Sequence, residues 1–204
     1  TGLVLGCVLA IEAYEYRVNH GVVEISPTAL ITVIAALLGL FAASLVAALV
    51  PGRDPLGLSE RGRTAYVYAA EAILALLFLH IRLTMPWLFT GMFSRYWPLV
   101  VMVLAFAGVA LGELFRRSNR LVLSEPLERT GAFLPLLPVF GFWMARPEVH
   151  YSLVLLLVGG LYASLAVMRK SFGFGILATL AANGGLWYFL GRQEGLGLLE
   201  HPQI

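Results

Sequence analysis

The feature that most constrains this chain is a run of 23 residues, Thr28–Val50, that contains no charged side chain. A helix needs roughly 20 mostly apolar residues to cross about 30 Å of bilayer hydrocarbon, so this run predicts a transmembrane helix. Of all 204 residues, 59% are hydrophobic and 13% are charged, against roughly 25% charged in a soluble domain. This composition excludes a water-soluble, disordered or collagen-like chain. It predicts an integral membrane protein.

Six further apolar runs predict an all-α, polytopic transmembrane helical bundle of about seven spans, in a single domain over residues 1–204. The predicted spans are 1–16, 28–50, 64–83, 97–115, 131–145, 151–168 and 172–191. The fifth contains Pro135 and Pro138, so we expect it to be kinked, tilted or re-entrant. The first begins inside an apolar segment, and we expect the chain to be a fragment of a longer one.

The distribution of basic residues predicts the topology. The second, fourth and sixth connections carry nine Lys and Arg residues, and the other connections with the C-terminal tail carry five. The positive-inside rule places the richer set in the cytoplasm. The tryptophans support the same topology, because this side chain prefers the membrane interface. All four lie at the predicted outer ends of spans: Trp87, Trp97, Trp143 and Trp187. Arginine makes up 13 of the 14 basic residues, which favours a bacterial protein, and hence the inner membrane.

A short internal similarity predicts a repeat. Leu58-Ser59-Glu60 recurs as Leu123-Ser124-Glu125, and an Arg-Thr pair follows each copy. Both copies precede outward-going spans in the predicted topology. The similarity indicates a parallel repeat of helical hairpins; the alternative is a chance match among common residues.

Glu71 is the strongest functional candidate. It lies seven residues after Thr64, about 10 Å along the helix axis. A carboxylate at that depth faces a bundle interior or a water-filled cavity, so Glu71 is predicted to be protonated or to bind a cation during transport. The alternative is a structural carboxylate satisfied by a tyrosine, the backbone or headgroups. Arg82 lies on the same helical stripe about 16 Å away, too far for direct pairing, and is a second pathway candidate.

Other polar residues near helix ends are weaker candidates. Glu113 precedes Arg116 and Arg117 by three and four residues, which predicts a local, structural ion pair. Imidazole and carboxylate groups suit transition metals, and several share the predicted outer side: Glu12, Glu15, His20, His80 and His150. Their spacing matches no metal signature, so we expect neither a metal nor a cofactor.

Small residues predict close helix packing at two pairs, Gly108 with Gly112 and Gly160 with Ser164. On the last span, Gly175, Thr179 and Asn183 share one face. We expect Asn183 to hydrogen-bond a neighbouring helix or loosened backbone, and a discontinuous, substrate-binding helix is the alternative.

The segment Asn183-Gly184-Gly185-Leu186-Trp187-Tyr188, with the closing Glu200-His201-Pro202-Gln203, resembles long, uncharacterised bacterial multi-pass inner-membrane proteins. The resemblance carries no activity and implies only that more spans follow.

Three functions stay open. The leading hypothesis is transport or channel-like passage of a small solute or ion, with Glu71 as coupling residue and Asn183 lining the path. The second is a non-catalytic scaffold or assembly subunit. The third is an intramembrane enzyme on lipid-linked substrates, although the nucleotide-binding and nucleophile motifs are missing from the sequence. We expect the bilayer and other membrane helices or subunits as partners, and the net charge of +2 argues against nucleic acid.

Overall fold

The computed structural model describes residues 26–145 and 147–192, together with residues 6, 7, 10, 11, 14 and 18. Glu12, Glu15 and His20 of the predicted outer cluster lie outside the described residues, as does most of the predicted first span. The described parts are helical, without strands. Seven α-helices and two short 3-10 helices follow each other in this order: α2 (Pro27–Leu49), η1 (Pro51–Arg53), α3 (Thr64–Thr84), η2 (Pro86–Phe89), α4 (Met92–Arg117), α5 (Leu121–Phe133), α6 (Leu136–Ala145), α7 (Tyr151–Arg169) and α8 (Phe172–Leu190).

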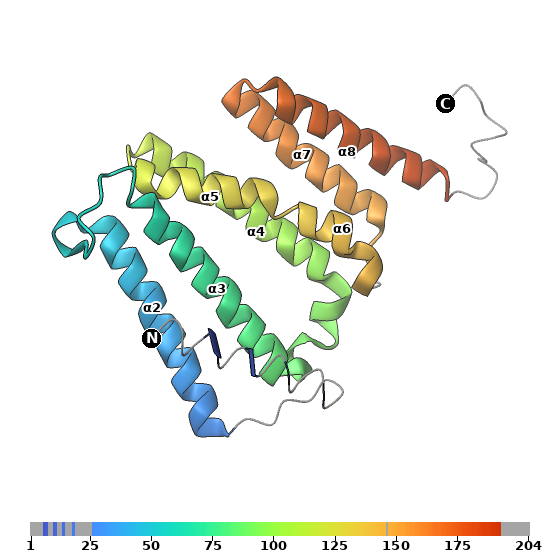
Figure 1. The fold of residues 1–204 in the computed structure, drawn as a ribbon. Helices are drawn as coiled ribbons and strands as arrows, with labels where there is room; N and C mark the ends of the chain where they lie inside the picture. The colour runs from blue at the N-terminus through green and yellow to red at the C-terminus, as the bar shows by residue number, and fades with distance from the viewer. Residues whose placement is uncertain are drawn as a thin grey trace. The chain divides into compact units, whose positions relative to one another are not determined.

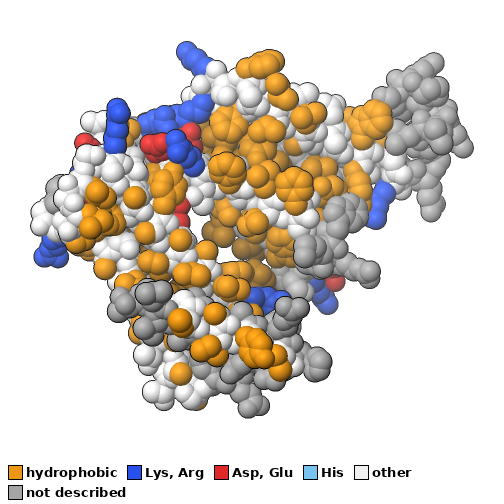
Figure 2. Space-filling view, viewed as in Figure 1, with side chains coloured by type: hydrophobic (Ala, Val, Ile, Leu, Met, Phe, Trp, Pro, Cys, Tyr) orange, Lys and Arg blue, Asp and Glu red, His pale blue; other side chains and the backbone are white. Residues whose placement is uncertain are grey.

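Five of these helices are long and apolar enough to span a membrane: α2, α3, α4, α7 and α8. They coincide with five of the seven predicted spans, and Figure 2 shows hydrophobic side chains over much of the visible surface. The all-helical fold and its compatibility with a membrane are therefore confirmed. The count of seven spans is not, because the predicted fifth span, 131–145, is divided between α5 and α6.

Proline chemistry explains this division. Pro135 has no backbone N–H and its ring clashes with the preceding turn, and Leu134 before it is biased away from the helical conformation. Accordingly, α5 ends at Phe133 and α6 begins at Leu136. Pro138 is the third residue of α6. It lies in the first turn, where backbone N–H groups have no acceptor within the helix, so the missing N–H of proline costs no helical hydrogen bond.

The helices form two compact units, which we describe separately: Thr1–Gly91 with Arg120–Pro126, and Met92–Asn119 with Leu127–Ile204. In the first unit, α2 and α3 pack as a hairpin (Figure 1). The Ser26 hydroxyl caps α2 by accepting from the Ala29 N–H over 3.2 Å. At the other end, Arg63 donates to the Ala48 carbonyl over 3.0 Å, which satisfies an acceptor at the end of α2.

The connection between α2 and α3 is organised by Asp54. Its carboxylate accepts the N–H groups of Leu56 and Leu58, at 2.9 and 2.5 Å, and the Tyr66 hydroxyl at 2.6 Å. The first copy of the predicted repeat, residues 58–60, lies in this non-helical connection, whereas the second copy lies inside α5. The two copies thus differ in conformation, and the repeat is not confirmed.

The second unit is built on α4, α6, α7 and α8. Its core contains Met102, Ala105 and Val109 of α4, Phe142 of α6 and the heptad-spaced Val154, Val158, Leu161 and Leu165 of α7. Helices α7 and α8 lie side by side (Figure 1). A Cβ added at Gly159 would lie 3.2 Å from the Ala178 carbonyl, and one at Gly185 would lie 3.0 Å from that of Ser152. The two helices are therefore antiparallel and in close contact.

This packing corrects one prediction. Gly160 and Ser164, expected at a helix interface, are exposed, and a Cβ at Gly160 would meet no atom within 4 Å. The contact is made one residue earlier, at Gly159, because the face that α7 turns to α8 includes that position. Gly108 does pack closely, as expected: an added Cβ would lie 3.1 Å from the Leu127 carbonyl of α5.

Candidate functional site: an ion-pair network and an interrupted helix

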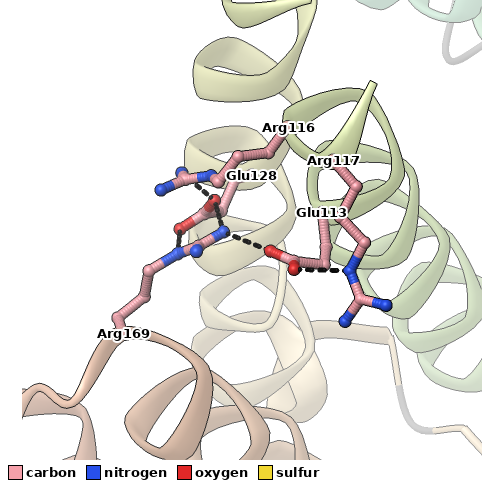
Figure 3. A network of polar contacts seen from close by, with 5 residues as sticks. All are labelled: Glu113, Arg116, Arg117, Glu128 and Arg169. Atoms are coloured by element: carbon pink, nitrogen blue, oxygen red, sulfur yellow. Dashed lines mark hydrogen bonds and ion pairs between the residues drawn. The ribbon is translucent and has the colours of Figure 1, made fainter. Parts of the chain in front are cut away.

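Five charged side chains form a network that joins α4, α5 and α7 within the second unit (Figure 3). Arg169, the last residue of α7, donates from Nε to Glu128 Oε1 over 2.5 Å and also from Nη2 to Oε2 of the same carboxylate. Its Nη2 lies 3.1 Å from Glu113 Oε2. Arg116 donates to Glu128 over 2.6 Å, and Arg117 donates to Glu113 over 3.0 Å. Each carboxylate thus binds two guanidinium groups.

The centre of this network is shielded and its edge is open. The side chains of Glu128, Arg169 and Glu113 are 13%, 17% and 22% exposed, whereas that of Arg117 is 78% exposed. A partly desolvated carboxylate is costly unless it is paired and hydrogen-bonded. The bidentate pairing of Arg169 with Glu128 meets this need, because a planar guanidinium matches the geometry of a carboxylate.

The predicted local pair at Glu113 is therefore only part of the arrangement. Glu113 does pair with Arg117, four residues on, as expected. Arg116 instead binds Glu128 of α5, and Glu113 also contacts Arg169 of α7. The network connects three helices, and its two members distant in sequence, Glu128 and Arg169, were not predicted.

The interruption between α5 and α6 is the second feature of the site. The last four carbonyl groups of a helix lack partners within that helix, and an unsatisfied carbonyl is costly in a bilayer. The Tyr162 hydroxyl of α7 donates to one of these, the Ala132 carbonyl, over 3.0 Å. In α6, the Val139 carbonyl accepts the Tyr151 hydroxyl over 3.1 Å.

One face of α7 makes all of these contacts. Tyr151, Tyr162 and Arg169 are separated by 11 and 7 residues, which at 100° per residue returns each side chain to within about 20° of the same direction. On this face of α7, Tyr151 bonds to α6, Tyr162 bonds to the end of α5, and Arg169 bonds to the middle of α5. Helix α7 therefore supports the interrupted helix through side chains on one of its faces.

A glycine contact fixes α5 against α4. A Cβ at Gly131 would lie 2.9 Å from both the Ala105 carbonyl oxygen and the Val109 nitrogen, closer than real Cβ atoms approach. Only a glycine allows these two backbones to meet at this distance. The contact lies three residues from the Glu128 carboxylate along α5.

The structure places the leading sequence candidates in α3 of the first unit. Glu71 is half-buried, and its Oε1 atom is shielded from solvent. Arg82 is exposed, and its guanidinium lies over the Phe89 ring, 5.4 Å from the centroid. His80, expected in a polar cluster on the outer side, is fully buried instead, because it lies on the packed face of α3 with Leu83.

Asn183 differs from the expectation of a contact with a neighbouring helix. Its side-chain amide donates to the Thr179 carbonyl of its own helix over 2.8 Å, and its side chain is exposed. Helix α8 runs without interruption through Gly184 and Gly185. Among the described helices, the interruption that proline causes lies between α5 and α6, whereas α8 is continuous.

His150 lies at the opposite end of α7 from the network, as the residue that precedes its first turn. It lines an open pocket of about 440 Å³ with Glu148, Tyr151, Tyr188 and Arg192. Glu148 forms an exposed ion pair with Arg95 over 3.1 Å. No group of three metal-ligating side chains occurs in the described part of the chain.

Comparison of the chain with protein-family models, curated proteins and solved structures gives no match. The resemblance to long bacterial multi-pass proteins stays a prediction, and the site has to be interpreted from its own chemistry.

Proposed function

We propose that this chain is a helical protein of the bacterial inner membrane that passes a small solute or ion, and that residues 127–145 of α5–α6, in the second unit, move relative to α7. The observation that carries the proposal is the interrupted helix held by side chains of α7. Non-helical backbone at membrane depth is tolerated where it is buried in protein or lines a cavity. Transporters use such breaks to build and gate their binding sites.

The length of the interrupted helix fits this role. Helices α5 and α6 contain 13 and 10 residues, joined by Leu134 and Pro135. At 1.5 Å per residue, residues 128–145 reach about 27 Å, close to the thickness of the hydrocarbon. We infer that α5–α6 forms a sixth, interrupted span in addition to the five continuous ones.

The ion-pair network supplies a contact that can open and close. Its partners come from three helices, and every bond joins groups that water or another ion can replace. In the predicted topology the network lies at the cytoplasmic end of α4 and α7, so its opening would admit water to the interrupted helix from that side. We infer that the network is a cytoplasmic gate.

Glu71 keeps its proposed role as the coupling or selectivity residue, in the first unit. A half-buried carboxylate in a membrane-spanning helix suits a proton or a small cation. Arg82, packed on Phe89, is the weaker pathway candidate because its charge is exposed.

Flux into proteoliposomes tests the proposal. Vesicles containing the full chain would be assayed with protons, using an internal pH dye, and with rubidium and chloride ions as separate probes. We expect at least one ion to enter faster than into protein-free vesicles and the Glu71→Gln variant to reduce this flux at least tenfold. Glu60→Gln, an exposed acid before the same helix, is the matched control and should not change it. Flux equal to that of empty vesicles for all three probes would contradict ion passage.

A scaffold function is the second candidate, and α8 favours it. Gly175, Thr179 and Asn183 share a face, with Thr179 and Asn183 exposed, and polar side chains on a membrane helix promote association with other helices. Absence of flux together with crosslinking of Asn183→Cys to another membrane protein would favour this function.

A further inference from the structure

Basic side chains outnumber acidic ones in and beside the ion-pair network. Lys170 follows Arg169 and is exposed. Together with the network, it makes a group of four basic and two acidic side chains: Arg116, Arg117, Arg169 and Lys170, against Glu113 and Glu128. This group has a net formal charge of +2.

The geometry of Arg117 leaves donors for a further acceptor. Arg117 binds Glu113 through Nε, and in the described residues neither of its Nη atoms has a hydrogen bond. The side chain is 78% exposed. Lys170 ends α7 in a left-handed backbone conformation, with φ 48°. Its side chain therefore leaves the backbone beyond the last helical turn. Both cations lie at the ends of membrane-spanning helices.

An exposed apolar residue precedes each of these cations in its helix. Leu114 lies three residues before Arg117 on α4, close to the same helical face, and Val167 lies in the last turn of α7, just before Lys170. Their side chains are 56% and 80% exposed. Each helix end therefore presents a cation at headgroup depth, followed by an apolar residue one turn deeper. This amphipathic order matches a phospholipid, with its phosphate outside and its acyl chains inside.

We propose that Arg117 and Lys170 form a binding site for the phosphate of an anionic phospholipid such as phosphatidylglycerol. Guanidinium groups pair with phosphate oxygens through two parallel hydrogen bonds. Both oxygens of Glu113 and of Glu128 already accept hydrogen bonds from arginines. The lipid chains lie along Leu114 and Val167. The site shares Arg117 with the proposed gate, but lipid binding is measured without any flux, so the two proposals can fail separately.

Lipid titration of the purified full chain tests this site. Native mass spectrometry in a neutral detergent would compare short-chain phosphatidylglycerol with phosphatidylcholine of the same chain length. We expect tighter binding of phosphatidylglycerol, weakened about tenfold in the Arg117→Gln/Lys170→Gln variant. The matched control, Arg95→Gln/Arg192→Gln, removes two charges at the other end of the unit and should bind as the wild type does.

Three results would overturn the proposal. Equal binding of both lipids, or equal weakening in both double variants, would show that no local headgroup site exists. Competition by inorganic phosphate at the concentration of the lipid would show a site for the free anion rather than for a lipid. Arg117→Lys/Lys170→Arg keeps both charges and should retain binding, which separates loss of charge from loss of fold.

Discussion

The Tyr162 hydroxyl donates a hydrogen bond to the Ala132 carbonyl oxygen over 3.0 Å, although 30 residues separate them in the sequence. Ala132 lies in the last turn of α5, where the chain stops being helical before Pro135. A side chain of α7 thus satisfies an acceptor that the interrupted helix exposes. The same helix holds α5 again through Arg169. The interruption is consequently a supported element of the structure.

Tyr162→Phe removes this hydroxyl and leaves the ring in place. We expect the free energy of unfolding to fall by about 1 kcal/mol, the typical net value of one such hydrogen bond, measured by SDS titration in detergent micelles. Tyr96→Phe, at an exposed tyrosine of α4, should change it by less than about 0.5 kcal/mol. Equal effects of both substitutions would show that the Ala132 contact has no energetic role.

Arg169→Gln removes the guanidinium that both network carboxylates share. We expect a loss of about 2 kcal/mol or more in unfolding free energy, because Glu113 and Glu128 are left partly buried with one arginine each. The same measurement on Arg95→Gln, whose pair with Glu148 is exposed, should give about 0–1 kcal/mol. A double-mutant cycle with Glu128→Gln should show coupling. Additive effects would mean that the two residues do not interact.

Gly131→Ala places a methyl group 2.9 Å from two backbone atoms of α4. Because backbone cannot move aside as a side chain can, we expect α4 and α5 to separate, at a cost of about 1–3 kcal/mol. Gly160→Ala is the matched control, since its added Cβ meets nothing within 4 Å, and alanine favours the helix. A Gly131→Ala protein as stable as the Gly160→Ala protein would contradict the close contact.

Asp54 gives the α2–α3 hairpin a dependence on pH. The Tyr66 hydroxyl, and to a smaller extent the backbone N–H groups of residues 56–58, lower the pKa of the Asp54 carboxyl below its ordinary value. A lowered pKa in the folded state means that the carboxylate stabilises the fold above the pKa of the unfolded chain. This stabilisation is lost as the pH falls through the folded-state pKa.

The unfolding midpoint, followed by circular dichroism from pH 6 down to pH 3, measures this effect. Asp54→Asn should lower the midpoint near neutral pH and flatten its decrease at acid pH, and Tyr66→Phe should act in the same direction. Tyr68→Phe, two residues further along α3, should leave the wild-type profile. An unchanged profile in Asp54→Asn would mean that this carboxyl does not contribute.

The sequence predicted the five continuous spans because each is a long apolar run bounded by charges or prolines, a signal that a bilayer imposes directly. It predicted that Pro135 and Pro138 disturb the fifth segment, without showing where the helix divides. Glu128 and Arg169 are 41 residues apart, so no local spacing reports their pairing. The spacing of Tyr151, Tyr162 and Arg169 by 11 and 7 residues places them on one helical face, and this is the feature of the sequence that indicates their shared role.

The glycine contacts show the same limit. Gly159 and Gly160 are adjacent and chemically identical, so which of them faces α8 depends on the rotation of α7 about its axis. That rotation is set by the core residues of the assembled unit, such as Leu161 and Leu165. Asn183 likewise was predicted to bond another helix or loosened backbone, whereas its own helix offers the Thr179 carbonyl.

The central claim, that the network between α5 and α7 opens for passage, is tested most directly by locking it. Glu128→Cys and Arg169→Cys would be combined with Cys7→Ser and joined by a short, reducible bifunctional thiol reagent, and ion flux into proteoliposomes would be recorded before locking, after locking and after reduction. We predict increased flux in the unlocked variant, where the ion pair is missing, at least tenfold lower flux when locked, and recovery on reduction. Flux that is the same in the locked and reduced states would contradict the claim that these helices separate.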